Sequence, residues 1–220
     1  MNLASPKQTP ATAADAVRTF FRFPGPCALT ASAAVAWCLR VWVGEVGAVD
    51  LMVGAAIIAL WPLQEWLIHV FVLHARPRTI GRFTWSPRNA IKHRMHHADP
   101  WRLELVFIPS FVWLPAIPLM WLGLPALVPL PVALTGIAVY YTFSAHYEWS
   151  HYLAHIRWRP PIAHYRRIVD AHRWHHFKNE SRWWGVSMLM ADRLLGTGGT
   201  PENVPPSDTV RTLGLPADAA

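Results

Sequence analysis

The sequence has little charge and almost no cysteine. Only 15% of its 220 residues are charged, while 53% are apolar, so an extended or disordered chain is excluded and one domain is the default. The two cysteines, Cys27 and Cys38, share one apolar stretch and offer neither a disulfide framework nor a thiolate metal site. The net charge is +7, and the basic residues alternate with long apolar blocks. This is not the pattern of a nucleic-acid binder. The abundant residues are 13 Trp and 12 His.

Four apolar blocks follow one another along the chain. They run from about Cys27 to Val43, Leu51 to Leu73, Leu105 to Leu124 and Ala126 to Phe143. Each of the first two can cross a hydrocarbon core of about 30 Å as a helix, and the last two are joined so tightly that they form a hairpin. The first block begins beyond residue 20 and further spans follow it, so we expect no cleaved signal peptide. The predicted fold is all-α, an integral membrane bundle of about four transmembrane helices.

The basic residues predict the orientation of this bundle. Lys and Arg lie before the first block, between the second and third, and after the fourth, whereas the two short opposite loops have none. Because positively charged loops remain in the cytoplasm, both termini and the long middle loop are predicted to be cytoplasmic in a multi-pass protein of the cell membrane. We expect residues 1–24 to form a tail with an interfacial helix, 25–198 the membrane domain, and the proline-rich residues 199–220 a disordered tail.

All twelve histidines fall between residues 69 and 176, and ten of them form spaced groups. The groups are HVFVLH with His69 and His74, HRMHH with His93, His96 and His97, HYLAH with His151 and His155, and HRWHH with His172, His175 and His176. Spacings of three and four place side chains on one helix face, so each HxxHH offers three imidazoles to a common point. The five-residue step from His69 to His74 departs from that register. Those two residues either bind different metals or require a local break in the helix.

The number of imidazoles predicts two metal ions. Ten exceed the four ligands of a structural zinc site and suit two five-coordinate metals in a His-rich helical cap on the cytoplasmic side. Imidazole binds Zn, Cu, Fe and Ni, so ligand type alone does not select the metal. A di-metal centre beneath an apolar bundle suits the oxidation of an unactivated C–H bond of a lipid with O2, which zinc cannot perform. We therefore predict two iron ions, although the purified protein could contain zinc.

Two segments resemble a known family. YEWSHYLAH, residues 147–155, is similar to the YDxxHYxxH of fatty acid 2-hydroxylases, and HRWHHFKNESRWWGVSMLMADRLLGT, residues 172–197, is similar to their last HxxHH segment. With the order of the four His groups, they resemble the fatty acid hydroxylase superfamily, which includes sterol desaturases, carotenoid hydroxylases and sphingolipid fatty acid 2-hydroxylases. The resemblance covers about residues 60–200.

The resemblance implies an O2-dependent membrane hydroxylase with the ten grouped histidines as metal ligands and a fatty acyl lipid as substrate, attacked next to its carbonyl. Two features depart from the family pattern: Val70 replaces a basic residue, and no HPGG haem motif is present. Electrons are therefore expected from a separate electron-transfer protein. A sterol or carotenoid hydroxylase or desaturase, and a non-catalytic membrane protein stabilised by zinc, remain alternatives.

Other polar residues are candidates to support the ligands. Glu65 and Glu148 precede His69 and His151 by four and three residues, and a carboxylate can fix an imidazole tautomer by accepting its second N–H. Glu65 is the stronger of the two, because a carboxylate near the end of a span is costly without a partner. His146 and His164 lie outside the four groups and are expected either to support the ligands or to lie at the interface. Four further carboxylates, which could equally form surface ion pairs, flank the HxxHH groups: Asp99, Asp170, Glu180 and Asp192.

Overall fold

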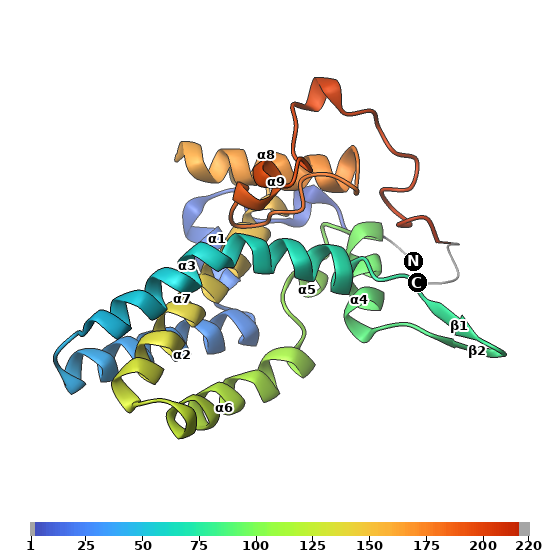
Figure 1. Ribbon diagram of the computed structural model, residues 1–220. Helices are drawn as coiled ribbons and strands as arrows, with labels where there is room; N and C mark the ends of the chain where they lie inside the picture. Colours follow the sequence, from blue (N-terminus) through green and yellow to red (C-terminus); the bar gives the residue numbers. More distant parts are fainter. Residues whose placement is uncertain (1–2, 216–220) are drawn as a thin grey trace. The chain divides into compact units, whose positions relative to one another are not determined.

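The computed structural model describes residues 3–215, and within them the chain is mostly helical (Figure 1). The α-helices are α1 (Ala13–Phe20), α2 (Pro24–Val43), α3 (Ala48–Ile68), α4 (Arg88–Ala98), α5 (Leu103–Val106), α6 (Ser110–Leu127), α7 (Leu130–Ala154), α8 (Ala163–Phe177) and α9 (Met190–Leu194). The 3-10 helices η1 (Pro6–Gln8) and η3 (Pro201–Asn203) lie near the two ends, and the π-helix η2 (His69–Leu73) directly continues α3. Strands β1 (Arg78–Ile80) and β2 (Phe83–Trp85) form an antiparallel hairpin.

The chain divides into two compact units. We call the first the histidine unit, because it contains all ten grouped histidines; it comprises Met1–Ala16, Pro62–Val106 and Ser150–Ala220. The second, the apolar unit, comprises Val17–Trp61 and Phe107–Trp149. The division falls within α1, α3 and α7, so each of these helices contributes residues to both units.

The core of the apolar unit lies between α2 and α7. Small residues of α2, Ala33 and Ala36, are buried with Ile137 and Tyr141 of α7, and Trp113 of α6 packs against the same cluster. Small side chains let helices approach closely. In a membrane the hydrophobic effect does not drive helices together, so they associate through van der Waals packing of this kind.

Arg40 shows how this unit accommodates a charge within an apolar helix. Its Nε lies 3.2 Å from Oδ1 of Asp50 and donates to the hydroxyl of Thr135 at 2.9 Å, and that hydroxyl donates to the same carboxylate oxygen at 2.6 Å. The two remaining nitrogens donate to the carbonyls of Gly44 and Glu45. A buried guanidinium is tolerated here because its N–H groups have hydrogen-bond acceptors and its charge is paired with the Asp50 carboxylate.

Three helical segments among the described residues are long and apolar enough to cross a membrane: Pro24–Val43, Ala48–Leu73 and Ser110–Leu127. The third has no buried residue, and a helix that is apolar on all sides suits lipid contact. A fourth span in α7 remains a prediction, because its apolar first half passes into the polar sequence around His151.

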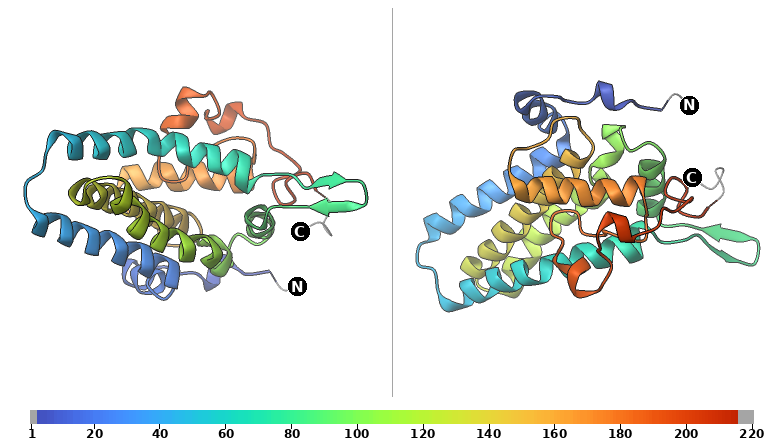
Figure 2. Two further views of the ribbon diagram at one scale, coloured as in Figure 1. Left: turned by 60° about the horizontal axis from the view of Figure 1, so that its bottom comes forward. Right: turned by 90° about the horizontal axis from the view of Figure 1, so that it is seen from above.

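Within the histidine unit, the β-hairpin extends beyond the helices (Figure 2). Ile80 pairs with Phe83 across a two-residue turn whose first residue, Gly81, has a φ of +60° that suits glycine. The hairpin connects the π-helix that contains His69 to α4, which contains the second His group.

Residues 199–215 differ from the expected disordered tail. The side chain of Val204 is buried and packs with Ala171 and Trp183, and the amide of Ser207 donates to the carbonyl of Lys178 at 2.7 Å. The prolines therefore shape an ordered, irregular segment, because a few apolar anchors and main-chain hydrogen bonds compensate for the missing regular structure. The rest of the predicted tail, 216–220, lies outside the described residues.

Candidate metal centre

The ten grouped histidines converge from four parts of the histidine unit, and they form two groups of five. In each group the atoms that could bind a metal all lie within 4.8 Å of one another. Group 1 consists of His69, His74, His93, His97 and His175. Group 2 consists of His96, His151, His155, His172 and His176. All are buried except His74, which is half-buried.

The π-helix brings His69 and His74 into the same group. The amide of His74 donates to the carbonyl of His69 at 3.0 Å, which closes a five-residue turn where an α-helix would close a four-residue one. The two ring centroids are 5.0 Å apart. Of the two interpretations of their spacing, the structure therefore has the local break in the helix, a frequent feature of functional sites.

Each HxxHH motif is divided between the two groups. In α4, His93 and His97 belong to group 1 and His96 to group 2; in α8, His175 belongs to group 1 while His172 and His176 belong to group 2. The expectation that each motif offers three imidazoles to one point is therefore wrong. Consecutive residues of an α-helix point about 100° apart, so adjacent histidines reach different points, while residues four apart share a point.

Two close approaches between ring nitrogens test whether the groups fit a metal ion. The Nε2 atoms of His69 and His93 are 3.2 Å apart in group 1, and those of His96 and His151 are 3.1 Å apart in group 2. Two nitrogens each about 2.1 Å from one ion, at roughly 95 to 110°, would lie about 3.1 to 3.4 Å apart. Both pairs therefore have the separation of neighbouring ligands on one metal.

Several buried ring nitrogens lack a hydrogen-bond partner among the described residues. Neither nitrogen of His172 or His176 has one, and Nε2 of His97 and of His175 is equally unmatched. Buried polar atoms without partners are costly in a protein interior, and coordination to an ion would satisfy them. The donor set therefore fits two metal ions.

Burial also keeps these imidazoles neutral. It lowers the pKa of His97 to about 3 and holds the pKa values of His172 and His176 well below the usual 6.5, because an imidazolium there would lose its hydration and face other imidazoles. Neutral imidazole is the form that binds a metal, so the site is prepared for metal binding at pH 7.

Main-chain carbonyls fix the tautomers of three group 1 histidines. Nδ1–H of His69 donates to the carbonyl of Trp184 at 2.6 Å, that of His175 to the carbonyl of Arg182 at 2.8 Å, and that of His97 to the carbonyl of Val210 at 2.9 Å. Each bond directs Nε2 into the group. The sequence predicted carboxylates in this role, and Val210 could not be found because it lies in the segment expected to be disordered.

Glu65 and Asp192 instead hold the loop that supplies two of those carbonyls. Glu65 accepts from the amides of Val186, Ser187 and Met188 at 3.1 to 3.3 Å and from the Ser187 hydroxyl. Asp192 accepts from the amides of Trp184 and Gly185 at 3.0 and 2.7 Å and from the hydroxyl of Thr197 at 2.6 Å. Both carboxylates thus position ligands through the backbone.

Gly185 permits this loop to close. A Cβ at that position would lie 2.2 Å from the carbonyl oxygen of Met188 and 3.0 Å from the Asp192 carboxylate. Gly185, Asp192 and Thr197 all follow the last HxxHH motif within the family-like segment 172–197. That segment therefore contained a signal for the loop that positions the histidines.

The other candidates lie outside both groups. Glu148, in the apolar unit, accepts from the amide of Ile108 at 2.8 Å, and neither His146 nor His164 belongs to a group. The remaining carboxylates have other partners. Asp99 accepts from the amide of Ala4 and forms an ion pair with Arg102, and Asp170 forms an ion pair with Arg159. Glu180 accepts from the hydroxyls of Ser207 and Thr209.

Comparison with known proteins connects this geometry to a chemical class. The family model described as fatty acid hydroxylase matches residues 54–197, which is more than half of the chain. The dihydroceramide fatty acyl 2-hydroxylase FAH2 of Arabidopsis thaliana is 28% identical over 143 residues, 62% of this chain and 56% of that protein. The ceramide very long chain fatty acid hydroxylase scs7 of Schizosaccharomyces pombe is 29% identical over 145 residues, 63% of this chain and 40% of that protein. The chain thus spans about half the length of these relatives.

A solved structure has a similar fold. The structure of full-length scs7p, in which only the hydroxylase domain is visible, aligns with a TM-score of 0.63 at 23% identity, over 83% of this chain and 68% of that one. At this identity the similarity shows the fold alone.

Proposed function

The chain belongs to the fatty acid hydroxylase family, and from this premise we propose that it is a membrane-bound di-iron oxygenase that hydroxylates a fatty acyl lipid. One observation supports the proposal most strongly: two groups of five buried imidazoles share helices α4 and α8, and the unmatched nitrogens lie within each group. A single structural metal would need only one such group, and four ligands suffice for it.

The ten grouped histidines would hold the two ions, five to each. Iron bound there would supply the redox chemistry that activates O2 toward an unactivated C–H bond. In the reaction one oxygen atom enters the C–H bond, the other leaves as water, and a separate electron-transfer protein supplies two electrons while two protons come from solvent. The described residues contribute by holding the imidazoles neutral and oriented through the carbonyls of Trp184, Arg182 and Val210.

The proposed position of attack is the carbon next to the acyl carbonyl. The segment YEWSHYLAH resembles the 2-hydroxylases, and the two relatives are named as a dihydroceramide fatty acyl 2-hydroxylase and a ceramide very long chain fatty acid hydroxylase. A lipid enters from the bilayer with its polar end at the surface, so the carbons nearest the carbonyl would reach a surface metal site first.

The proposed topology has about four membrane helices with the metal centre on the cytoplasmic side of the cell membrane. The distribution of Lys and Arg supports this orientation, and three segments that could span a membrane support the multi-pass arrangement. An electron donor from the cytoplasm would reach the histidine unit directly in this orientation.

The test is to express the chain in cells under ¹⁸O2 and to compare their lipids with those of cells expressing the His176→Ala variant. We expect hydroxylated acyl chains containing one ¹⁸O with the wild-type chain and none with the variant, at equal amounts of membrane-inserted protein. Metal analysis should give about two irons per active chain. One tightly bound zinc without oxygen consumption would instead support a non-catalytic membrane protein stabilised by zinc. A hydroxylated sterol or carotenoid as the product would show that the substrate is not a fatty acyl lipid.

A further inference from the structure

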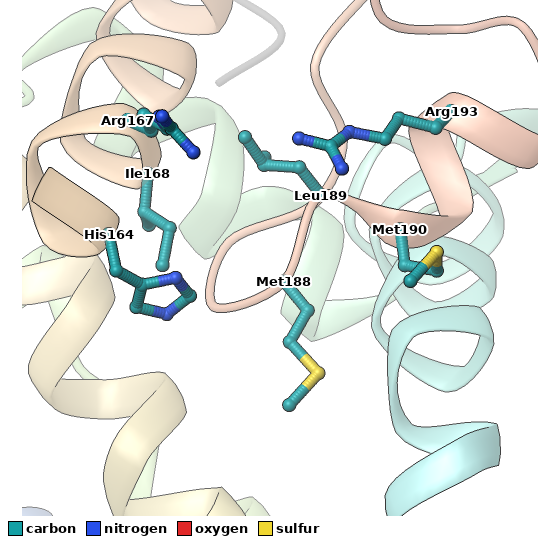
Figure 3. A pocket seen from close by; sticks show the side chains of 7 residues that line it. All are labelled: His164, Arg167, Ile168, Met188, Leu189, Met190 and Arg193. Carbon is teal, nitrogen blue, oxygen red and sulfur yellow. The ribbon is translucent and has the colours of Figure 1, made fainter.

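The histidine unit contains a pocket of about 320 Å³ between α8 and the segment that leads into α9 (Figure 3). Its lining residues are His164, Arg167 and Ile168 from α8 and Met188, Leu189, Met190 and Arg193 from the other wall. None of them belongs to either metal group. The pocket therefore lies outside the site described above, although both of its walls also support that site.

The lining combines an apolar interior with two positive charges. Ile168, Leu189 and the two methionines supply hydrocarbon surface, and no acidic residue lines the pocket. In Figure 3 the guanidinium groups of Arg167 and Arg193 extend toward each other from opposite walls. Neither side chain has a hydrogen-bond or ion-pair partner among the described residues. Two convergent guanidinium groups over an apolar surface suit a ligand with an anionic, oxygen-rich head and a hydrocarbon body.

The pocket is connected to the metal centre through α8. His164, Ile168, His172 and His176 follow one another at intervals of four, so they form one stripe along the helix. At 1.5 Å per residue, Arg167 lies about 7.5 Å along the axis from His172, a group 2 residue. The opposite wall includes Met188, whose amide donates to the Glu65 carboxylate that holds the loop beside His69.

We propose that this pocket binds the phosphate head of the lipid substrate, so that the substrate is a phosphate-bearing acyl lipid. This inference rests on the proposed hydroxylase function and specifies its substrate class. In a diacyl phospholipid, roughly six bonds separate the phosphorus from the carbon next to the acyl carbonyl of the chain on the middle glycerol carbon. An extended chain advances about 1.2 Å per bond, so those six bonds cover about 7 Å. That length is comparable to the roughly 7.5 Å by which Arg167 and His172 are separated along the axis of α8.

The test compares two lipids that differ only in the phosphate, dioleoyl phosphatidate and dioleoylglycerol. Their binding to the purified full chain in neutral detergent micelles is measured by native mass spectrometry. We expect the wild-type chain to bind the phosphatidate about tenfold more tightly, because each guanidinium contributes a charge-assisted hydrogen bond. Arg167→Gln and Arg193→Gln should each remove most of this preference while the metal content is unchanged.

The matched control is Arg166→Gln, which removes the same charge from the same helix. Arg166 donates to the carbonyl of Pro161 and does not line the pocket, so this variant should keep the preference. Equal binding of the two lipids by the wild-type chain would overturn the proposal, as would an equal loss in Arg166→Gln, which would indicate general attraction to positive charge. Full displacement of the phosphatidate by millimolar inorganic phosphate would identify a site for free phosphate and would also overturn it.

A separate variant distinguishes this proposal from the hydroxylase function. His97→Ala should lose lipid hydroxylation but keep the preference for phosphatidate. If the wild-type chain shows the preference and hydroxylates no lipid, the proposed function fails while the binding site remains. If it hydroxylates acyl chains of neutral lipids with no phosphate preference, only the present inference fails.

Discussion

His96 and His97 are consecutive residues of α4, yet their imidazoles serve different groups. Nε2 of His96 lies 3.1 Å from Nε2 of His151 in group 2, whereas His97 belongs to group 1 and donates through Nδ1 to the carbonyl of Val210. The two residues therefore allow the two proposed metal positions to be disturbed one at a time.

We predict that His96→Ala and His97→Ala each lower the metal content from about two to about one per chain and reduce hydroxylation at least 100-fold. The reason is that removal of one imidazole weakens one position directly, while the apolar helices that insert the chain are unchanged. Metal analysis of the purified proteins, together with their yield in the membrane fraction, checks this. His146→Ala is the control, because His146 lies outside both groups, and it should retain two metals. Wild-type turnover in either test variant would exclude the di-metal assignment.

Gly185→Ala tests the loop that orients His69. A Cβ there would lie 2.2 Å from the carbonyl oxygen of Met188, so the loop must move, at a cost of about 1 to 3 kcal/mol or more. We expect a lower melting temperature and a partial loss of metal. Gly123→Ala in α6 is the control, because its nearest neighbour would lie 4.0 Å away, and it should be neutral or slightly stabilising. Equal melting temperatures for the two variants would contradict the tight closure of this loop.

The sequence predicted which histidines gather at the candidate metal centre far better than it predicted how they divide into two groups. The clustering of histidines in the sequence identified all ten that the structure gathers, because histidines a few residues apart on a helix remain near one another whatever the tertiary structure. The 100° step between consecutive helical residues separates adjacent histidines, but which group each of them joins depends on where α4 and α8 lie relative to the π-helix. That placement is a tertiary property, and no local pattern encodes it.

The supports of the ligands were less predictable for a related reason. Carboxylates near histidines in the sequence suggested direct contacts, but Glu65 and Asp192 bind main-chain amides of residues 184–188, and main-chain carbonyls orient His69 and His175. Backbone groups are present at every residue, so their roles leave no trace in residue identity. In the sequence the loop is marked by Gly185, where a side chain cannot fit, and by Asp192 and Thr197 in the same trailing segment.

The depressed imidazole pKa values predict that the metal-free protein loses stability in mild acid. An unfolded histidine titrates near 6.5, whereas burial lowers the pKa of folded His97 to about 3, so the unfolded state binds more protons between these values. The contribution of His97 to the free energy of unfolding is therefore fully present above about pH 6.5, and it is lost as the pH falls toward 3. At pH 5, His97 alone accounts for a loss of about 2 kcal/mol. Denaturant unfolding of metal-free protein at pH 7.5 and pH 5 measures this loss, and equal free energies of unfolding at the two pH values would contradict it.

Cysteine labelling tests the proposed topology. Cys27 and Cys38 are both exposed, so they are first replaced by serine, and single cysteines are then introduced at Arg88 and at Lys178. These positions lie at the beginning of α4 and just after α8, the two helices that share both metal groups. An impermeant maleimide added to intact cells should label neither position, and both should react after the cells are opened. Labelling of the two positions from opposite sides would be incompatible with a shared metal centre.

The last prediction concerns the carbon that is attacked. If the acyl carbonyl remains near the membrane surface, the carbon beside it is the first to come within about 3 to 3.5 Å of the oxidant, and proximity alone then selects the position. Cells that express the chain are given fatty acids deuterated only at carbon 2, or only at carbons 9 and 10, and the hydroxylated lipids are analysed by mass spectrometry. We expect loss of one deuterium from the first acid and none from the second. Loss from the second acid would mean that a bent tunnel presents the middle of the chain, and a product hydroxylated on a ring carbon would exclude an acyl substrate.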